Sequence, residues 1–340
     1  MPSLYITEPG ATLRLQGRSL LVTDRGEDGA RVAMLEVEPH NVDSIGLLGD
    51  VHVTADALRH CLDSGIPIAW FDRRGELQGR CVPASDRNGS LRLAQYGAAT
   101  DPVRADAMVR AIVQAKIQNA VTLLVDVQGN DPANTVVPPA VATLKELAQA
   151  LPQHTSVEAL RGVEGAAAAA FFGAFGSALR AGTGMVFRTR ERRPPPDPVN
   201  ALLSFASVLL GNRLAGLVEV RGLDPAIGFL HELRAGRPSL ALDMLEEWRT
   251  PIVERFVLRV CNLRSLRREH FEADAEDPRG VRMTRDGLRA FFVEWEKFLL
   301  RPVRGADGQD VPVVAALGRQ VDAMARALAE GSVYQPFVMR

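Results

Sequence analysis

The spacing of apolar residues changes once along this chain, near residue 100, and that change constrains the fold more than any other feature. Before it, short apolar or alternating runs such as LYIT, TLRLQ and RVAMLEV are separated by turn signals such as Glu8-Pro9-Gly10. Short strands joined by short turns are typical of an antiparallel sheet or sandwich, not of a parallel sheet. We expect one helix among them, at about residues 54–63.

After residue 100 the apolar residues recur every three or four positions, which predicts helices. The first begins with Asp101 as a cap and Pro102 at the first helical position. Similar patterns cover residues 141–151, 156–181, 198–219, 238–268, 284–300 and 312–330.

The predicted fold class is therefore α+β, with two domains, as a chain of 340 residues favours. A small N-terminal β-sheet or sandwich domain covers residues 1–85, and a linker follows at 86–100. A larger all-α C-terminal domain covers residues 101–340.

Composition excludes several classes of protein. The net charge of −1 gives no general attraction to nucleic acid or anionic lipid, so a polyanion would need a local patch. No glycine-rich phosphate loop is found, which argues against a nucleotide-binding enzyme. The longest uncharged apolar run, residues 165–179, is 15 residues, short of the roughly 20 that span a bilayer. Three unpaired cysteines fit a reducing compartment, so we expect a cytoplasmic protein that does not bind membranes.

Acidic residues gather on one predicted helix, residues 240–249. Asp243, Glu246 and Glu247 fall within an arc of about 100° on a helix. Taken alone, this pattern favours an amphipathic helix whose acidic face meets water. However, no lysine or arginine lies within the arc, and His231 lies just upstream, across a break that would let it fold back. A metal site therefore stays open as the alternative.

Glu164 is the one ionisable residue of the apolar segment 163–179. A capping box at residues 155–158 places it well inside a helix, where a buried carboxylate needs a cation, a proton or a hydrogen-bond donor. On spacing alone, a partner such as Arg161 or Arg180 is as good as a metal ion. A Glu, a His and a Glu from separate segments would make an oxygen-rich site for a divalent cation.

Several segments together resemble one family. LRGVEGAAAAAFF, RRPPPDPVNALLSF, DPAIGFLHE, GRPSLALDMLEEWR and the early LYIT are similar to CRISPR-associated protein one, the endonuclease and integrase of CRISPR adaptation. The resemblance covers nearly the whole chain in the same order. The length and LALDMLEEWR look most like the branch of type I systems, subtype I-C. The resemblance implies an N-terminal β domain that mediates dimerisation and a helical domain that carries the active site.

The resemblance also implies which residues do the chemistry. Glu164, His231 and Glu246 correspond to the metal ligands, although many relatives have aspartate where Glu246 stands. Asp243 matches an additional catalytic acid, and Glu247 fits a further supporting acid. Two carboxylates and one imidazole suit Mg²⁺ or Mn²⁺. His231 is also a candidate for proton transfer, since imidazole titrates near neutrality.

Contacts to DNA would come mainly from arginines that bind phosphate. The candidates are Arg188, Arg190, Arg192 and Arg193 in a proline-rich loop, Asn200 and Arg249, and more remotely Arg255 and Arg259. A helix-start hydrogen bond is an equal alternative for Asn200, and a solvated face is favoured for Arg255 and Arg259.

The implied reaction inserts new spacers into a CRISPR array by attack of a DNA 3′-hydroxyl on repeat phosphodiesters. The implied partners are double-stranded and branched DNA, a second copy in a homodimer, a dimer of CRISPR-associated protein two, and an accessory CRISPR nuclease. Two alternatives remain open. One is a metal-dependent DNA phosphodiesterase without integration, and the other is a non-catalytic DNA-binding scaffold.

Overall fold

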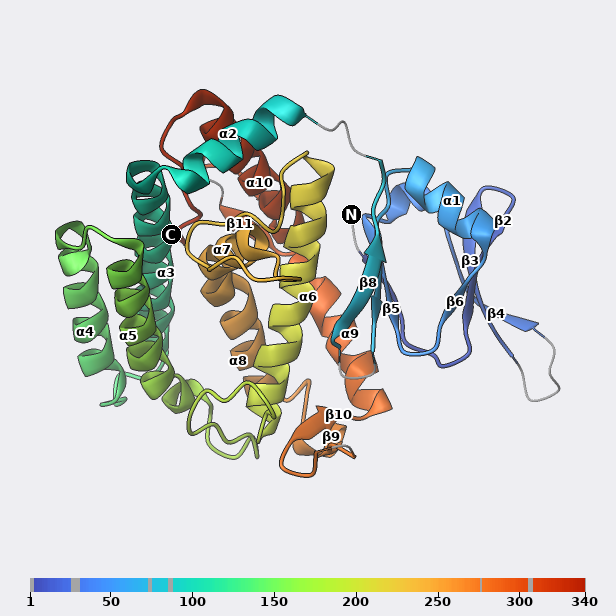
Figure 1. Ribbon diagram of the computed structural model, residues 1–340. Coiled ribbons are helices and arrows are strands. Elements are labelled where there is room, and N and C mark those ends of the chain that lie inside the picture. The colour runs from blue at the N-terminus through green and yellow to red at the C-terminus, as the bar shows by residue number, and fades with distance from the viewer. Residues whose placement is uncertain are drawn as a thin grey trace.

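A computed structural model describes residues 3–25, 31–72, 75–84, 88–275, 277–304 and 308–339 of the chain (Figure 1). Strands dominate the N-terminal part, and helices make up most of the rest. The N-terminal elements are β1 (Ser3–Ile6), β2 (Thr12–Gln16), β3 (Ser19–Arg25), β4 (Arg31–Val37), β5 (Ser44–Leu48), β6 (His52–Val53), α1 (Ala55–Asp63), β7 (Ile68–Phe71) and β8 (Leu77–Cys81). The expected helix at 54–63 is confirmed, with Thr54 as its cap.

The eight strands form two four-stranded sheets, with strand orders β1-β5-β7-β8 and β4-β3-β2-β6. The two sheets share a core to which Leu13, Leu20, Ile45 and Ile68 contribute, so a sandwich is confirmed. The expectation of antiparallel pairing is only partly right. β2–β3–β4 and β7–β8 are antiparallel, but β1–β5–β7 and β2–β6 are parallel. The parallel β5–β7 pair is possible because β6 and α1 lie between these strands in the chain and provide the crossover.

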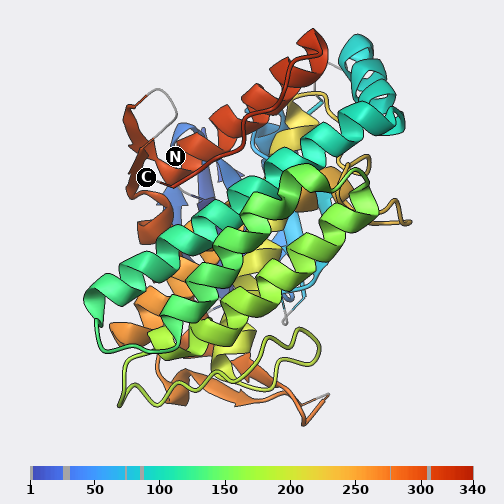
Figure 2. The same ribbon diagram turned by 90° about the vertical axis from the view of Figure 1, so that its left-hand side faces the viewer.

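The helical part follows the predicted periodicity. Its helices are α2 (Gly89–Thr100), α3 (Pro102–Asn130), α4 (Val137–Ala150), α5 (Val157–Phe175), α6 (Pro198–Val220), α7 (Ser239–Trp248), α8 (Arg255–Asn262), α9 (Arg285–Leu299) and α10 (Val313–Glu330). Figure 2 shows α3, α4 and α5 side by side, and each of the three packs against the other two. α7 packs between α3 and α6, so it lies at the centre of this part (Figure 1).

Three expectations about this part need correction. Residues 86 and 87 of the predicted linker at 86–100 lie outside the described residues, and the rest is mostly α2, which Asn88 caps and which buries Leu91 and Ala98. The predicted helix 238–268 is interrupted by a π-helical turn, Arg249–Glu254, which contains Pro251. The domain is also not all-α, since it includes two short hairpins. They are β9 (Phe271–Ala273) with β10 (Val281–Met283), and β11 (Pro302–Arg304) with β12 (Asp310–Pro312).

α6 is the core helix of this part. Among the described residues it is also the one helix long and apolar enough to cross a membrane by those two criteria alone. However, 67% of its most apolar window is buried inside the protein. Its apolar character is therefore accounted for by packing.

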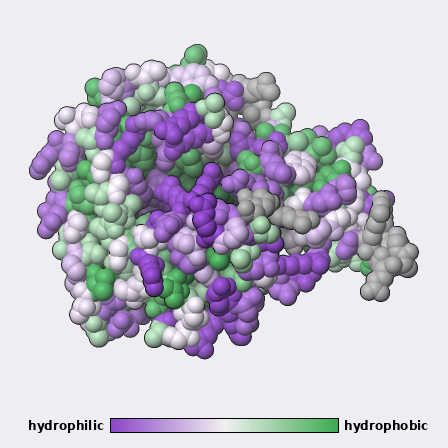
Figure 3. Space-filling model, turned by 60° about the horizontal axis from the view of Figure 1, so that its bottom comes forward, coloured by the Kyte–Doolittle hydropathy of each residue, from purple (hydrophilic) through white to green (hydrophobic). Residues whose placement is uncertain are grey.

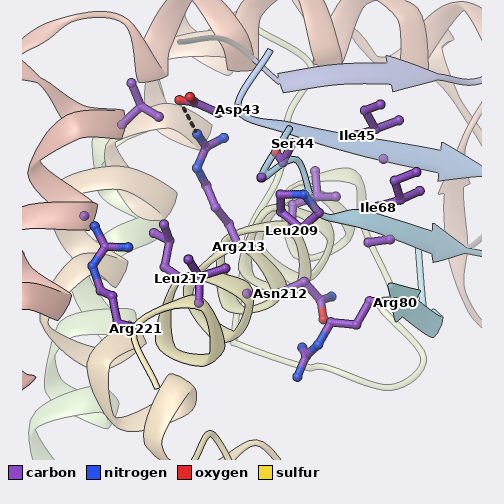
Figure 4. Close-up of a pocket in the computed structure, with 18 of the residues that line it drawn as sticks. Asp43, Ser44, Ile45, Ile68, Arg80, Leu209, Asn212, Arg213, Leu217 and Arg221 are labelled. Carbon is purple, nitrogen blue, oxygen red and sulfur yellow. Dashed lines mark hydrogen bonds and ion pairs between the residues drawn. The ribbon is translucent and has the colours of Figure 1, made fainter. Parts of the chain in front are cut away.

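The β domain packs firmly on the helical domain. Tyr5 stacks on Phe292 of α9 with ring centroids 4.2 Å apart, and Glu8 accepts hydrogen bonds from Arg289 at 2.7 Å. Between β5, β7, α6 and α10 the interface leaves a cavity of about 460 Å³, across which Arg213 of α6 points toward Asp43 (Figure 4). Both stacking and ion pairs therefore fix the two domains to each other.

Candidate active site

Two carboxylates from separate helices meet at a single lysine. Glu164 comes from α5 and Glu246 from the end of α7, and both accept hydrogen bonds from the ammonium of Lys116 in the middle of α3. The side chains are 25%, 7% and 13% exposed, respectively. The structure therefore brings Glu164 and Glu246 together, as predicted. The cation between them is neither Arg161 nor Arg180, the partners considered for Glu164.

Lys116 was not singled out from the sequence, although a signal for it exists. The chain has only three lysines against 37 arginines. Lys116 follows Ile112 and Val113 by four and three residues and precedes Ile117 and Ala120, all four of them buried. A lysine on the buried face of a long helix needs an anionic partner, since its charge is otherwise costly to bury.

His231 is held in one orientation by Asp243. The fully buried Asp243 carboxylate accepts the backbone N–H groups of Phe229, Leu230 and His231 at 2.5, 3.0 and 2.9 Å. It also lies 2.7 Å from Nδ1 of the His231 ring. An ionised carboxylate only accepts, so Nδ1 carries the hydrogen of that bond in the neutral ring. Nε2 then presents its lone pair, and within the described part of the chain it has no hydrogen-bond partner.

Two further residues place the segment that carries His231. Arg161 of α5 donates a hydrogen bond of 2.6 Å to the carbonyl oxygen of Leu230. Gly228 lies so close to α7 that a Cβ there would stand 2.6 Å from the Asp243 carboxylate and 2.7 Å from the Ser239 backbone. Only glycine permits this approach. The segment is therefore fixed to both helices that carry the carboxylates.

A second cation, Arg249, lies on the other side of Glu246. Its guanidinium is 3.5 Å from Glu246 and 3.6 Å from Glu254, and all three side chains are buried. Burial alone would raise the pKa of Glu246, but Lys116 and Arg249 outweigh it and lower the pKa to about 2. Glu246 is therefore ionised. Because Arg249 is buried and paired, it does not fit the predicted role of a direct phosphate contact.

Glu247 points away from this cluster. Its carboxylate accepts hydrogen bonds from the Tyr334 hydroxyl at 2.6 Å and from the backbone N–H of Phe337. Phe337 also stacks on Trp248 with ring centroids 4.1 Å apart. Burial raises the pKa of Glu247 to about 8. Glu247 thus anchors the C-terminal segment, and its predicted role as a supporting acid of the site is not what its contacts indicate.

The acidic side of α7 is therefore not exposed to solvent. Asp243, Glu246 and Glu247 are 0%, 6% and 0% exposed, so the amphipathic interpretation is wrong. The three acids serve three different partners: a histidine loop, a pair of cations and the C-terminal segment.

The donor set fits a divalent metal ion, although the side chains are not gathered around one point. Of the described residues, no three His, Cys, Asp or Glu side chains lie close enough to hold one ion in this structure. At this site the Lys116 ammonium lies between the two carboxylates. Still, Glu164 and Glu246 reach the same cation, and a carboxylate on Nδ1 is the usual support of a histidine that binds metal through Nε2. The chemistry of these donors suits Mg²⁺ or Mn²⁺.

The proline-rich loop is fastened by Asn200. This fully buried side chain accepts from Arg190 at 2.9 Å and from the Glu191 N–H at 3.0 Å, and it donates to the Thr189 carbonyl at 2.8 Å. Arg190 also donates to Ser204. Asn200 and Arg190 therefore shape the loop from inside, and the prediction that they contact DNA directly does not fit their burial and pairing.

The remaining arginines of the loop are exposed. Arg192 lies near enough to Arg249, Glu246 and Glu164 for their charges to act on it. Arg188 is exposed, and Arg193 pairs with Glu76 at 3.6 Å. More remotely, Arg255 and Arg259 line a separate cleft of about 1230 Å³. Of the predicted DNA contacts, Arg192 is thus an exposed residue on which the charges of Glu246 and Glu164 act.

The sequence matches the family model "CRISPR associated protein Cas1" over residues 4–297. A "CRISPR-associated endonuclease Cas1" of Rhodospirillum rubrum is 35% identical over 87% of this chain and 85% of its own length. A solved Cas1 protein from Thermotoga maritima is 26% identical, with a TM-score of 0.79 over the full length of both chains. A casposase solved with its integration product has the same fold, with 21% identity and a TM-score of 0.84 over 99% of this chain and 93% of its own.

The family model covers most of the chain, and the relative from Rhodospirillum rubrum is similar over most of both chains. The subtype within the CRISPR systems stays a prediction. The chain belongs to the Cas1 family of CRISPR-associated endonucleases.

Proposed function

We propose that this chain is a metal-dependent DNA endonuclease and integrase that inserts spacers into a CRISPR array. The observation that carries the proposal is the support of His231 by Asp243, beside two carboxylates that meet at one cation. A bound Mg²⁺ or Mn²⁺ would polarise the phosphoryl oxygen and stabilise the leaving alkoxide. The casposase of this fold was solved with its integration product, which supports DNA joining as a reaction that a protein of this fold can perform.

Each residue would have a distinct task. Glu164, His231 and Glu246 would hold the ion, with Glu246 kept ionised by the cations beside it. Asp243 fixes the tautomer and direction of His231. Arg161 and Gly228 hold the loop in register with the two helices. The site would thus present a fixed set of donors to DNA that approaches from outside.

The joining assay separates this proposal from its rivals. A short duplex with free 3′-hydroxyl groups is incubated with the protein, Mn²⁺ and a supercoiled plasmid that carries a repeat. An integrase gives a joined, relaxed plasmid. A simple phosphodiesterase would cut without joining, and a scaffold would bind DNA without either product. Addition of CRISPR-associated protein two, the proposed partner, should raise the yield.

Arg192 is expected to bind a DNA phosphate. Arg192→Ala should weaken DNA binding and reduce the slope of log affinity against log salt by about 1, since one phosphate contact is lost. Arg59→Ala serves as the control, because Arg59 is exposed and pairs with Asp56 on the remote α1. Fluorescence anisotropy at several salt concentrations measures both. An unchanged slope for Arg192→Ala would show that this arginine is solvated and does not bind a DNA phosphate.

Exposed hydrophilic residues could complete a DNA-binding surface. Figure 3 shows one face on which hydrophilic residues surround a hollow in the helical domain. Such a surface suits recognition of the DNA backbone, which depends on charge and hydrogen bonds and not on apolar contact.

The β domain is proposed to form the homodimer through β4. This strand is the edge of its sheet, and Val32, Met34 and Leu35 on it are 54%, 48% and 45% exposed. An apolar edge strand invites pairing with another chain. We expect Val32→Asp with Met34→Asp to give a folded monomer by size exclusion with light scattering.

The control for this dimer test is Val103→Asp, since Val103 is 79% exposed on α3. A dimer that survives both β4 substitutions would exclude this edge as the interface. Substitution is a cleaner test than deletion of residues 1–85, because deletion would also uncover Phe292 beneath Tyr5.

A further inference from the structure

Lys116 lies where two carboxylates from different helices would otherwise face each other. Its backbone is fixed, because the α3 residues around it are buried in the core of the helical domain. Its ammonium donates to Oε1 of Glu164 and to Oε2 of Glu246, so one cation joins α3, α5 and α7. These are the same two carboxylates that are proposed to hold the metal ion.

The charges around Lys116 explain why a cation is needed between Glu164 and Glu246. Two like charges brought together in a buried place repel each other strongly. Lys116 bonds to both carboxylates where its side chain is only 13% exposed, so its ammonium offsets their charges. Arg249 lies on the other side of Glu246, where it pairs with Glu246 and Glu254. Lys116 is therefore the cation that bonds to Glu164 and Glu246 together.

We propose that Lys116 is the internal counter-ion of the metal-free site, and that a divalent cation must displace its ammonium from Glu164 and Glu246 in order to bind. This inference rests on the proposed metal-dependent function. An ammonium that bonds to both carboxylates occupies the space between them and repels a second cation. The four-carbon stem of lysine has free rotation, so the ammonium can withdraw while α3 stays in place. The lysine thus stabilises the preassembled carboxylates and lowers their affinity for metal.

The test compares Mn²⁺ binding by the wild type and by Lys116→Met, which keeps the length of the side chain but removes its charge. Isothermal titration should give a dissociation constant for Mn²⁺ at least about tenfold lower in Lys116→Met, because competition and repulsion are gone. In EDTA the melting temperature of this variant should fall below that of the wild type. Mn²⁺ should then raise it by more than it raises the wild type. Lys145→Met is the control, since Lys145 is an exposed lysine on α4.

Equal or weaker Mn²⁺ binding by folded Lys116→Met would overturn the inference, because a purely structural lysine would support the site and its loss would loosen it. If Lys116→Met does not fold in EDTA, Lys116→Arg is tested in its place. Arginine keeps the charge, so this variant is expected to bind Mn²⁺ no more tightly than the wild type. Tighter binding by Lys116→Arg would also overturn it. Failure of the proposed function itself looks different: Glu246→Gln would then leave the Mn²⁺ binding of the wild type unchanged.

Discussion

Glu246→Gln is expected to reduce metal-dependent strand joining and DNA cleavage by orders of magnitude. Glutamine keeps the size and polarity of the side chain but removes the charge that balances a divalent ion. The plasmid-joining assay in Mn²⁺ measures the loss directly. Glu164→Gln and His231→Ala should give a similar loss, and any two of the three should add little, since members of one site act as a unit.

The same substitution should also destabilise the protein. The sequence alone suggests relief of repulsion among acids, but Glu246 actually lies between Lys116 and Arg249. Breaking a buried ion pair costs about 3 kcal/mol or more. The pKa of Glu246 is lowered from 4.5 to about 2, so its contribution is present above pH 4.5 and is lost as pH falls toward 2. Thermal melts of Glu246→Gln should show a lower melting temperature and a weaker pH dependence in that range.

Glu247→Gln is the matched control for activity, because Glu247 is adjacent but faces Tyr334 and Phe337. We expect it to join DNA at close to the wild-type rate. Two results would contradict the assignment: near wild-type cleavage by Glu246→Gln, or an equal loss in both variants.

Asp243→Asn should cause the second large effect, on stability and activity together. Both oxygens of Asp243 accept: one bonds to Phe229 and Leu230, and the other to the N–H and ring of His231. In asparagine an NH₂ group would replace one of these two oxygens, so the two N–H donors on that side would lose their acceptor. Unsatisfied buried donors cost about 1–3 kcal/mol each, so we expect a loss of about 3 kcal/mol or more. The ring of His231 would also lose its fixed direction, and joining should fall at least about tenfold.

Denaturant unfolding and the joining assay measure these two effects. Glu232→Gln is the control, because Glu232 is next to His231 but exposed, and it pairs with Arg161 and Arg234 at the surface. A variant Asp243→Asn with wild-type stability would show that the carboxylate is not the anchor of the loop.

Periodicity predicted most elements of this fold well because helices such as α3, α9 and α10 bury one face and expose the other. It did not predict the parallel strand pairs, since alternation along a strand carries no information on the direction of its neighbour. The motifs singled out Glu164, His231 and Glu246 as the expected metal ligands. The surroundings of these residues were not predicted, because the acidic arc identifies one face of α7 but not the residues that pack against it. Lys116 arrives from α3, more than a hundred residues earlier, and the segment that covers Glu247 comes from beyond α10.

The attachment of the C-terminal segment sets the order in which the protein can mature during synthesis. Tyr334 and Phe337 bond to Glu247, and Met339 donates its N–H to Asn119 of α3 at 2.7 Å. These residues follow α10 in the chain, so the ribosome releases them after all the described helices. N-terminal domains generally fold first as a chain emerges, so the β sandwich can form early. The helix that carries Glu246, by contrast, is not fully packed until residue 339 has left the exit tunnel. The surroundings of Glu246 are therefore completed later than the β sandwich.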